Sequence, residues 1–395
     1  MMAKRNVINL SLFETGSEKE PNAKIAELYG QAPDIYKDSS AGQIVARTCP
    51  VRNSTCDVTA NRHQVAHLGL DNRKSITSNE AAEIRNVYGN TPLPLGICSC
   101  WTRRQNETEA RPWILCPKRL LSLEPPKPVI PREVRQLFQI ADGTRVGVWS
   151  ELKLRHRERE NANNRFFEYT FDYLLMGLDE TGNPTGAPYI IEVMTSSTRG
   201  GGLTEHMVDV LLGRNQRHLG EVVDSVYTPN YRQVFERMLG QFIAKSEIAE
   251  RWGGRTIWVF QDVLLDYIEQ TTAFDSNKLT DASTGNVFAE VYRLEAPSTD
   301  KKSALSGLHL VHHKSLRGRA RLNEHSADYT SFLGLGYAPP YEELIKTLKA
   351  GIQRHRSSTG RSENAMVNPT ARSGRWFDFV WGDDIDPRES EKLSF

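Results

Sequence analysis

This sequence lacks a dominant charge, a long apolar run and any cysteine beyond residue 116. Its 50 lysine and arginine residues nearly balance 49 aspartate and glutamate residues, so the formal net charge is only +1. Overall charge therefore does not indicate a nucleic-acid partner, although local basic clusters can still bind a phosphate backbone. No apolar run approaches the roughly 18 residues that a membrane-spanning helix needs, so we expect no membrane partner.

The beginning of the sequence, MMAKRNVINLSLFETGSEKE, has no apolar stretch of the kind that a secretory signal peptide requires. We therefore expect a cytoplasmic protein whose five cysteines stay reduced rather than forming disulfides. A chain of 395 residues with 38% hydrophobic and 25% charged residues is typical of a globular protein with a sizeable core.

Shifts in composition divide the chain into segments. We predict an N-terminal arm (1–45), a cysteine-containing module (46–122), a proline-rich connector with the sequence LEPPKPVIPRE (123–133), a larger domain (134–357) and a C-terminal tail (358–395).

The larger domain alternates between strand and helix patterns. Strands are predicted over 144–154, 165–178, 188–194, 255–261 and 286–294, and helices over 203–213, 230–252, 263–270 and 341–355. We also expect a short helix over 23–29 and a further strand over 376–381. Together these patterns predict an α/β (α+β) fold in which a mixed sheet is flanked by helices.

Two acids, Asp172 and Glu192, lie inside apolar strands that the turn DETGNPTG joins. A turn centred near residue 183 would pair Asp172 with about residue 193 and bring the two carboxylates together on one face of the hairpin. Strand alternation would put Phe171 and Tyr173 on the other face. Two ionised carboxylates in such a place repel each other and lose hydration, and Mg²⁺ relieves both costs.

A third acid, Glu151, ends the strand before this hairpin and is a candidate to join the two carboxylates. The spacing of Asp172 and Glu192 is similar to the nuclease motif D…(D/E)-x-K, but Met194 occupies the position of the lysine. Methionine carries no charge and donates no useful hydrogen bond, so either another group such as Lys153 or Arg199 replaces it, or metal and water carry that role alone. The alternative is that these strand acids simply face solvent at a sheet edge.

The cysteines are confined to a segment that is poor in aliphatic residues. Four thiolates can close a tetrahedral structural metal site, which would stabilise a segment with little core of its own. The candidate ligands are Cys49, Cys56, Cys98 and Cys116, with Cys100 as a spare, although no CxxC pair is present. The alternative is that all five are reduced, buried thiols without a metal.

Two basic clusters could contact a phosphate backbone or guanine bases, because arginine is the usual partner of both. The residues concerned are Arg155, Arg157 and Arg159 in one cluster and Arg317 and Arg319 in the other. A solvated surface without a partner is the alternative for each of them.

Several short segments, taken in order, resemble the NotI-type restriction endonucleases, which have the PD-(D/E)xK nuclease fold. The segments are TCP (48–50), TC (55–56), GIC (96–98), WILCPKRLL (113–121), SELKL (150–154), FDYLL (171–175), IIEVMT (190–195) and NYRQVFERMLGQFIAKSEIA (230–249). The resemblance covers roughly residues 45–300, and its specificity lies in the combination.

The resemblance implies a PD-(D/E)xK core with a small four-cysteine module. It implies that Asp172 and Glu192 bind Mg²⁺ with Glu151 nearby, and that Cys49, Cys56, Cys98 and Cys116 hold one structural iron, which thiolate chemistry alone does not distinguish from zinc. A homodimer would cut double-stranded DNA at a long palindrome rich in G and C, in a prokaryotic cell whose cognate DNA methyltransferase protects its own sites.

One departure from the family concerns the position two residues after Glu192, which is lysine in the general motif and glutamine in the family, but Met194 here. Three other functions therefore stay open. The chain could be a non-catalytic or impaired DNA-binding protein of the same fold, a repair nuclease without site preference, or an unrelated enzyme whose hairpin acids are incidental.

Overall fold

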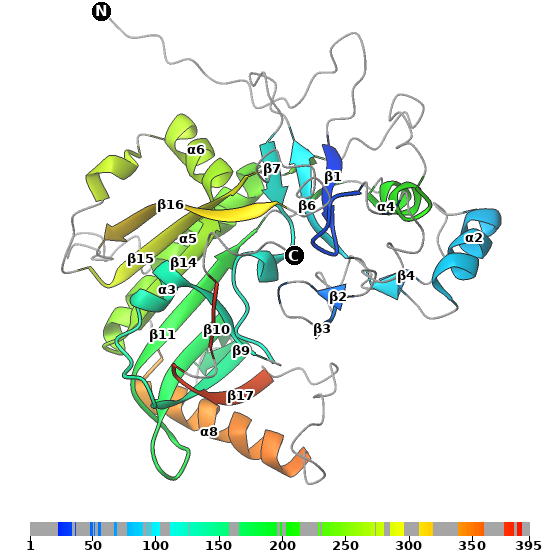
Figure 1. Ribbon diagram of the computed structural model, residues 1–395. Coiled ribbons are helices and arrows are strands. Elements are labelled where there is room, and N and C mark those ends of the chain that lie inside the picture. The colour runs from blue at the N-terminus through cyan, green and yellow to red at the C-terminus, as the bar shows by residue number, and fades with distance from the viewer. Residues whose placement is uncertain are drawn as a thin grey trace, which may run out of the picture.

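A computed structural model gives the architecture of the chain (Figure 1). The residues that the structure describes are 23–33, 36, 48–49, 51, 54–56, 67–68, 77–89, 93–94, 96–102, 111–125, 127–157, 166–195, 198–199, 203–213, 228–229, 231–272, 274–279, 285–295, 308–318, 339–358, 375–382 and 385–388.

The centre of the fold is a mixed sheet of seven strands in the order β16-β15-β14-β11-β10-β9-β17. Their bounds are β9 Arg145–Arg157, β10 Phe166–Leu178, β11 Pro184–Met194, β14 Arg255–Gln261, β15 Val287–Glu295, β16 His309–Gly318 and β17 Arg375–Val380. Strands β11, β14 and β15 run parallel to one another, and the other neighbours pair antiparallel. The expected mixed sheet is therefore confirmed.

Helices cover one face of this sheet. They are α5 (Tyr231–Arg251), α6 (Asp262–Thr271) and α8 (Tyr341–Ser358), and their apolar sides pack on β9, β10, β11 and β14 in two clusters of buried residues. The opposite face packs against α3 (Arg132–Gln136) and against Leu120, Leu121 and Leu123 from the segment before it. Glu192 belongs to the helix-covered face, because its neighbours Ile190 and Met194 lie in the clusters under the helices.

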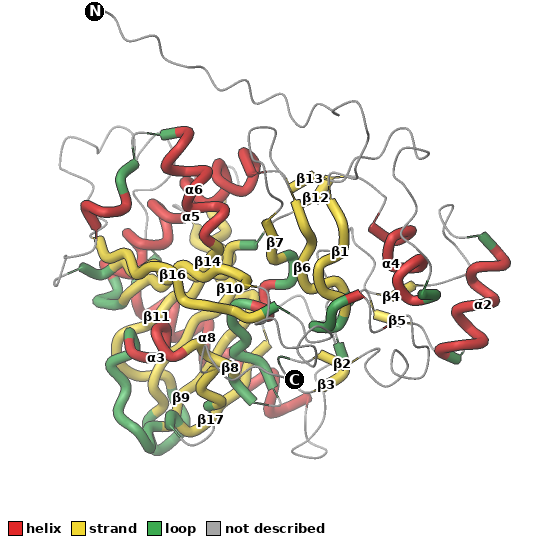
Figure 2. The backbone as a smooth tube through the Cα atoms, turned by 45° about the horizontal axis from the view of Figure 1, so that its top comes forward, coloured by secondary structure: helices red, strands yellow, loops and turns green. Residues whose placement is uncertain are grey.

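A smaller sheet, in the order β1-β6-β7, lies beside the main one (Figure 2). It consists of β1 (Ala23–Leu28), β6 (Ile97–Thr102) and β7 (Arg111–Ile114). Helices α2 (Ser78–Tyr88) and α4 (Leu203–Leu211) pack with it, and the Tyr88 hydroxyl donates a hydrogen bond of 2.7 Å to the Leu211 carbonyl.

The other elements are short. Paired segments are β2 (Thr48–Cys49) with β3 (Ser54–Thr55), β4 (His67–Leu68) with β5 (Leu93–Pro94), β8 (Val129–Pro131) with β18 (Asp386–Arg388), and β12 (Thr198–Arg199) with β13 (Thr228–Pro229), and the 3₁₀ turns are η2 (Pro117–Arg119) and η3 (Ser276–Leu279).

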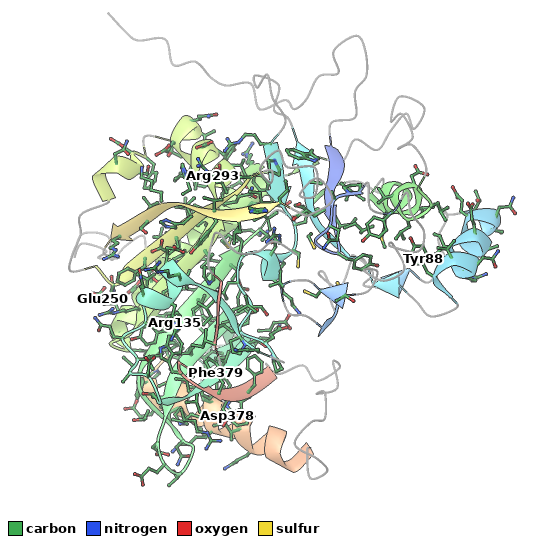
Figure 3. The ribbon with its side chains drawn as sticks, viewed as in Figure 1. Tyr88, Arg135, Glu250, Arg293, Asp378 and Phe379 are labelled. Atoms are coloured by element: carbon green, nitrogen blue, oxygen red, sulfur yellow. The ribbon has the colours of Figure 1, made fainter. Side chains whose placement is uncertain are left out.

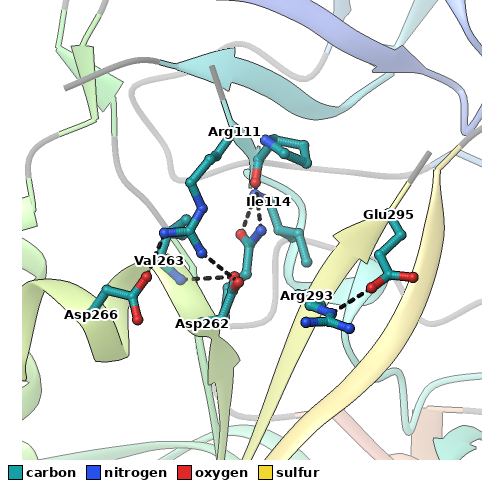
Figure 4. A network of polar contacts seen from close by, with 9 residues as sticks. Arg111, Ile114, Asp262, Val263, Asp266, Arg293 and Glu295 are labelled. Atoms are coloured by element: carbon teal, nitrogen blue, oxygen red, sulfur yellow. Dashed lines mark hydrogen bonds and ion pairs between the residues drawn. The ribbon is translucent and has the colours of Figure 1, made fainter. Parts of the chain in front are cut away.

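Strand β7 is fastened to the main sheet through the end of β14 (Figure 4). The Gln261 side chain accepts a hydrogen bond of 2.8 Å from the Ile114 N–H and donates one of 2.5 Å to the Pro112 carbonyl. Arg111 forms ion pairs with Asp262, at 2.5 Å, and with Asp266 of α6. The two Gln261 hydrogen bonds satisfy the Ile114 N–H and the Pro112 carbonyl of β7, and the ion pairs of Arg111 tie the same strand to α6.

The strands and helices predicted for the larger domain are present within a few residues of their expected bounds. The predicted strand over 376–381 is β17, whose Asp378 and Phe379 lie at one edge of the sheet (Figure 3). Strand β16 and helix α2 were not predicted. No helix in the described part of the chain is long and apolar enough to cross a membrane.

The helix expected over 23–29 is wrong, because Ala23–Leu28 forms strand β1. Its residues favour a helix in isolation, but tertiary pairing overrides that preference. Residues from Ala23 to Leu28 pair with Thr102 to Ile97 of β6, and Ile25 and Leu28 are buried. Glu27 is also buried, and it bonds with Arg119 and Ser99, which a solvent-facing helix could not offer.

Gly254 joins α5 to β14, and substituting it tests how closely this connection packs against β11. A Cβ atom at Gly254 would lie 2.2 Å from the Pro188 carbonyl oxygen at the start of the β11–β14 pairing. We expect Gly254→Ala to lower the free energy of unfolding by about 1–3 kcal/mol in urea titrations. Gly240, inside α5 with no atom within 4 Å of its added Cβ, is the control, and Gly240→Ala should raise it by about 0.5–1 kcal/mol. Equal effects of the two substitutions would contradict the proposed close approach.

Candidate active site

Asp172 and Glu192 lie directly across from each other in the β10–β11 pair. The register pairs Tyr173 with Ile191, which places Asp172 opposite Glu192. Asp172 Oδ2 accepts a hydrogen bond of 2.9 Å from the Val193 N–H, and Glu192 Oε1 accepts a longer one of 3.4 Å from the Asp172 N–H. The prediction that the hairpin brings these two carboxylates together is confirmed.

The regular alternation expected in β10 is wrong at this point. Phe171 and Leu174 are three residues apart yet pack in the same cluster under the helices, while Tyr173 faces the other side. The same change occurs in β9, where Trp149 and Leu152 share that cluster. Both strands therefore switch faces where Asp172 lies.

Glu151 lies at the face switch in β9. Its backbone has a φ of +49°, a left-handed conformation that costs energy for a residue with a side chain. The register places it across from Asp172, but its side chain is exposed. In the described part of the chain, no group of three or more His, Cys, Asp or Glu side chains is arranged to hold a metal ion. Glu151 therefore does not complete a three-acid site in this structure.

Lys245 of α5 contacts Glu192 from the covering helix, and sequence reasoning missed it. Its Nζ lies 2.5 Å from Glu192 Oε2, and the two side chains are only 6% and 1% exposed. The ammonium also lies 5.7 Å from the centre of the Phe171 ring. A signal was present in the sequence, because Lys245 falls in the apolar stripe of α5 that contains Val234, Met238 and Ala249.

Met194 has a structural role in this arrangement. It is buried with Met238, Val234 and Trp258 between β11, β14 and α5. A lysine at this position would have to bury its charge in that apolar cluster, which is costly without a partner. Lys153, one proposed substitute, is exposed and lies between Leu152 and Leu154, which face the helices. The side chain of Arg199, the other, lies outside the described residues.

The pKa values of both carboxyl groups, Asp172 and Glu192, are raised. Burial raises the pKa of Asp172, while the charges of Lys245 and Arg237 and the hydrogen bond from Val193 act against that shift. Burial, followed by the neighbouring Asp172 charge, raises the pKa of Glu192 well above the ordinary range, and Lys245 opposes this. The single ammonium thus compensates only part of the cost of two carboxylates.

The carboxylate pair fits Mg²⁺ in its donor chemistry. Mg²⁺ commonly takes one or two protein carboxylates and completes its coordination with water and substrate phosphate oxygens. Asp172 and Glu192 would be those two ligands.

Four of the five cysteines share one buried neighbourhood. Burial raises the pKa of Cys98, and the charges of Cys116, Glu27, Cys49 and Cys56 raise it further. Burial, with Cys49 and Cys56, also raises the pKa of Cys116 to about 12, while Lys118 opposes the shift. These thiols are electrostatic neighbours, but they do not form a closed metal-binding group among the described residues.

Cys100 differs from the other four. Burial alone raises its pKa, and it packs with Trp113, Met194 and Phe260 in the cluster under α5 and α6. The other four cysteines are those of the expected ligand set, and their metal site stays a prediction, because the described residues show no group arranged to hold a metal. The donor chemistry fits one structural iron or zinc.

The predicted DNA contacts are only partly described. The side chains of Arg155, Arg157, Arg159 and Arg319 lie outside the described residues. Arg317 is exposed on the edge strand β16, with its guanidinium 5.9 Å from the centre of the Phe288 ring. In the same strand, His312 Nε2 forms a hydrogen bond of 2.8 Å with Glu290 Oε2. The Lys314 ammonium donates one of 2.8 Å to Asn277 Oδ1.

A scan against models of known protein families found no match to this sequence, and a search of curated proteins found none either. What the protein does is therefore inferred from its own side chains.

Asp172→Asn tests the charge imbalance at the carboxylate pair. Because both native pKa values are raised, the free energy of unfolding of the metal-free protein should fall as pH rises from the ordinary carboxyl range through the raised values. The free energy of unfolding of Asp172→Asn should fall less over the same pH range, and near neutral pH this variant should be more stable than wild type. Mg²⁺ should stabilise wild type, by about 2.7 kcal/mol at 100 times its dissociation constant, and the variant far less. Identical pH and Mg²⁺ responses would contradict the assignment.

Cys98→Ser and Cys100→Ser form a matched pair for the thiol site. We expect the purified wild type to carry about one iron or zinc atom per chain, measured by elemental analysis. Cys98→Ser should lose that metal and much of the stability of the N-terminal part, whereas Cys100→Ser should keep the metal. Equal metal content in both variants would contradict the proposed ligand set.

Proposed function

We propose that this protein is a type II restriction endonuclease that hydrolyses double-stranded DNA at a specific site with Mg²⁺. The observation that carries the proposal is the juxtaposition of Asp172 and Glu192 on neighbouring strands, under a helix that supplies a buried cation. Perturbed carboxylates next to a cation are more common at catalytic sites than in structural cores. The order of the motifs in the sequence supports the same family, with a PD-(D/E)xK core.

The side chains of the chain would share the work as follows. The carboxylate oxygens of Asp172 and Glu192 would bind the metal. The Val193 N–H holds the carboxylate of Asp172 in place, and the Lys245 ammonium holds that of Glu192. Bound Mg²⁺ supplies Lewis-acid chemistry, which polarises a phosphoryl oxygen and activates water. The burial of Glu192 limits competing water and strengthens every charge interaction around it.

Arg237 adds positive charge on the outer side of the pair. It is exposed on α5, and its charge acts on Asp172. Two other arginines of the same helix, Arg232 and Arg251, form ion pairs with Glu236 and Glu247. An exposed arginine beside the carboxylates suits a contact with the DNA phosphate backbone.

The remaining parts of the proposal follow from the family. A homodimer would match the two-fold symmetry of a palindrome, and arginines would read its G·C pairs in the major groove. The four-cysteine site would hold iron or zinc as a structural element. The cognate partner would be a DNA methyltransferase that protects host sites.

A second candidate is a non-catalytic or impaired DNA-binding protein of the same fold. The burial of Met194 favours it, because the motif position is filled by an apolar side chain that cannot reach a phosphate. A repair nuclease on the same fold would also use Asp172 and Glu192, but it would cut without site preference.

The proposal is tested by digesting a large sequenced DNA with the protein and Mg²⁺, with EDTA as the control, and mapping the fragment ends. We expect discrete fragments that share one palindromic sequence at their ends. Asp172→Ala should lower the cleavage rate by at least about 1,000-fold, while DNA affinity measured in EDTA stays within a few-fold. No cutting would favour the DNA-binding protein, and unspecific degradation would favour the repair nuclease.

A further inference from the structure

Lys245 on α5 and Glu192 on β11 both lie at the boundary between the same two apolar clusters. On the strand, Glu192 lies between Met194 in one apolar cluster and Ile190 in the next. On the helix, Lys245 lies between Met238, which packs with Met194, and Ile248, which packs with Ile190. The helix and the strand thus each place one charged residue at the boundary between two apolar clusters, and the two groups meet at 2.5 Å.

Stability alone does not account for this buried pair. Replacing a buried ion pair with well-packed apolar residues is often neutral or stabilising, because the desolvation cost offsets the attraction. Here the cost is larger, since Asp172 adds a second carboxylate beside Glu192. An apolar core would avoid all three charges, so their presence indicates a function.

The charge count suits a phosphodiester substrate. With both carboxylates ionised and Lys245 protonated, the group carries one net negative charge. A divalent cation would change this to one net positive charge, which attracts the single negative charge of a phosphodiester.

We propose that Lys245, delivered by helix α5, performs the task that the motif assigns to a lysine two residues after Glu192, by donating a hydrogen bond to a non-bridging oxygen of the scissile phosphate. This inference rests on the proposed function. Lys245 contacts Glu192 Oε2, which would be a metal ligand under the proposed function, so its ammonium would lie beside a phosphate bound to that metal. Charge that develops on the phosphate in the transition state is stabilised by such a preplaced donor. Met194 is thereby free to pack in the core.

Two substitutions, Lys245→Met and Lys245→Arg, test this role together. The control is Arg251→Met, which removes an ion pair with Glu247 elsewhere on the same helix. We expect Lys245→Met to cut at least about 100-fold more slowly in single-turnover assays. It should still bind DNA, and Mg²⁺ should raise its Tm more than that of wild type, because the ammonium no longer competes for Glu192. Arg251→Met should behave as wild type in each assay.

Lys245→Arg separates catalysis from charge compensation, and it also covers the case in which Lys245→Met fails to fold. Arginine keeps a partner for Glu192, so the fold, the Mg²⁺ response and the DNA affinity should persist. Its planar guanidinium cannot place one compact ammonium at the same point, so cleavage should fall by at least about tenfold. Cutting by Lys245→Arg within about threefold of wild type would overturn the role and leave Lys245 as a counter-ion. A wild-type protein that binds Mg²⁺ but cuts no DNA would instead overturn the proposed function and this role with it.

Discussion

The contact between Glu192 and Lys245 in the interior of the molecule, with Asp172 beside it, is the constraint on which the rest of the structure depends. Two carboxylates and one ammonium occupy the interface between sheet and helix, at the boundary between two apolar clusters. Placing such charges in the interior is costly, and the Lys245 ammonium offsets only part of the cost of two neighbouring carboxylates. The same imbalance that costs stability creates an affinity for a divalent cation, so the cost and the proposed activity have one physical origin.

The surrounding fold holds this group in place from three sides. The β10–β11 hairpin fixes the two carboxylates opposite each other, and the Val193 N–H holds Asp172. Helix α5 ends at Arg251, before the turn at Gly253 and Gly254. Because Gly254 packs against Pro188, the chain leaves α5 close to β11, and the helix lies over that strand. The small sheet with the cysteines is tied to the end of β14 by Gln261. Cys98 lies in strand β6 of this small sheet, which is thus attached to the strand beside β11.

Local sequence signals predicted the parts of the site that depend on local structure. Asp172 and Glu192 were predicted to meet because the turn between their strands is a strong local signal, although a register shift between Leu175 and Gly177 also sets their pairing. Lys245 was missed because its contact depends on how a helix packs over a sheet, although a lysine in an apolar stripe was a usable signal. The helix expected at residues 23–29 was wrong for a related reason, since pairing with β6 is a long-range interaction. The exposed, left-handed Glu151 reflects a switch of faces in two strands, which no alternation pattern predicts.

The most direct test of the central claim is to locate a divalent cation in crystals of the protein grown with Mn²⁺, which substitutes for Mg²⁺ and scatters X-rays anomalously. The account predicts an anomalous peak bound by carboxylate oxygens of both Asp172 and Glu192, with the Lys245 ammonium adjacent to it. A well-ordered site without that peak, with Lys245 still bound to Glu192 at saturating Mn²⁺, would contradict it.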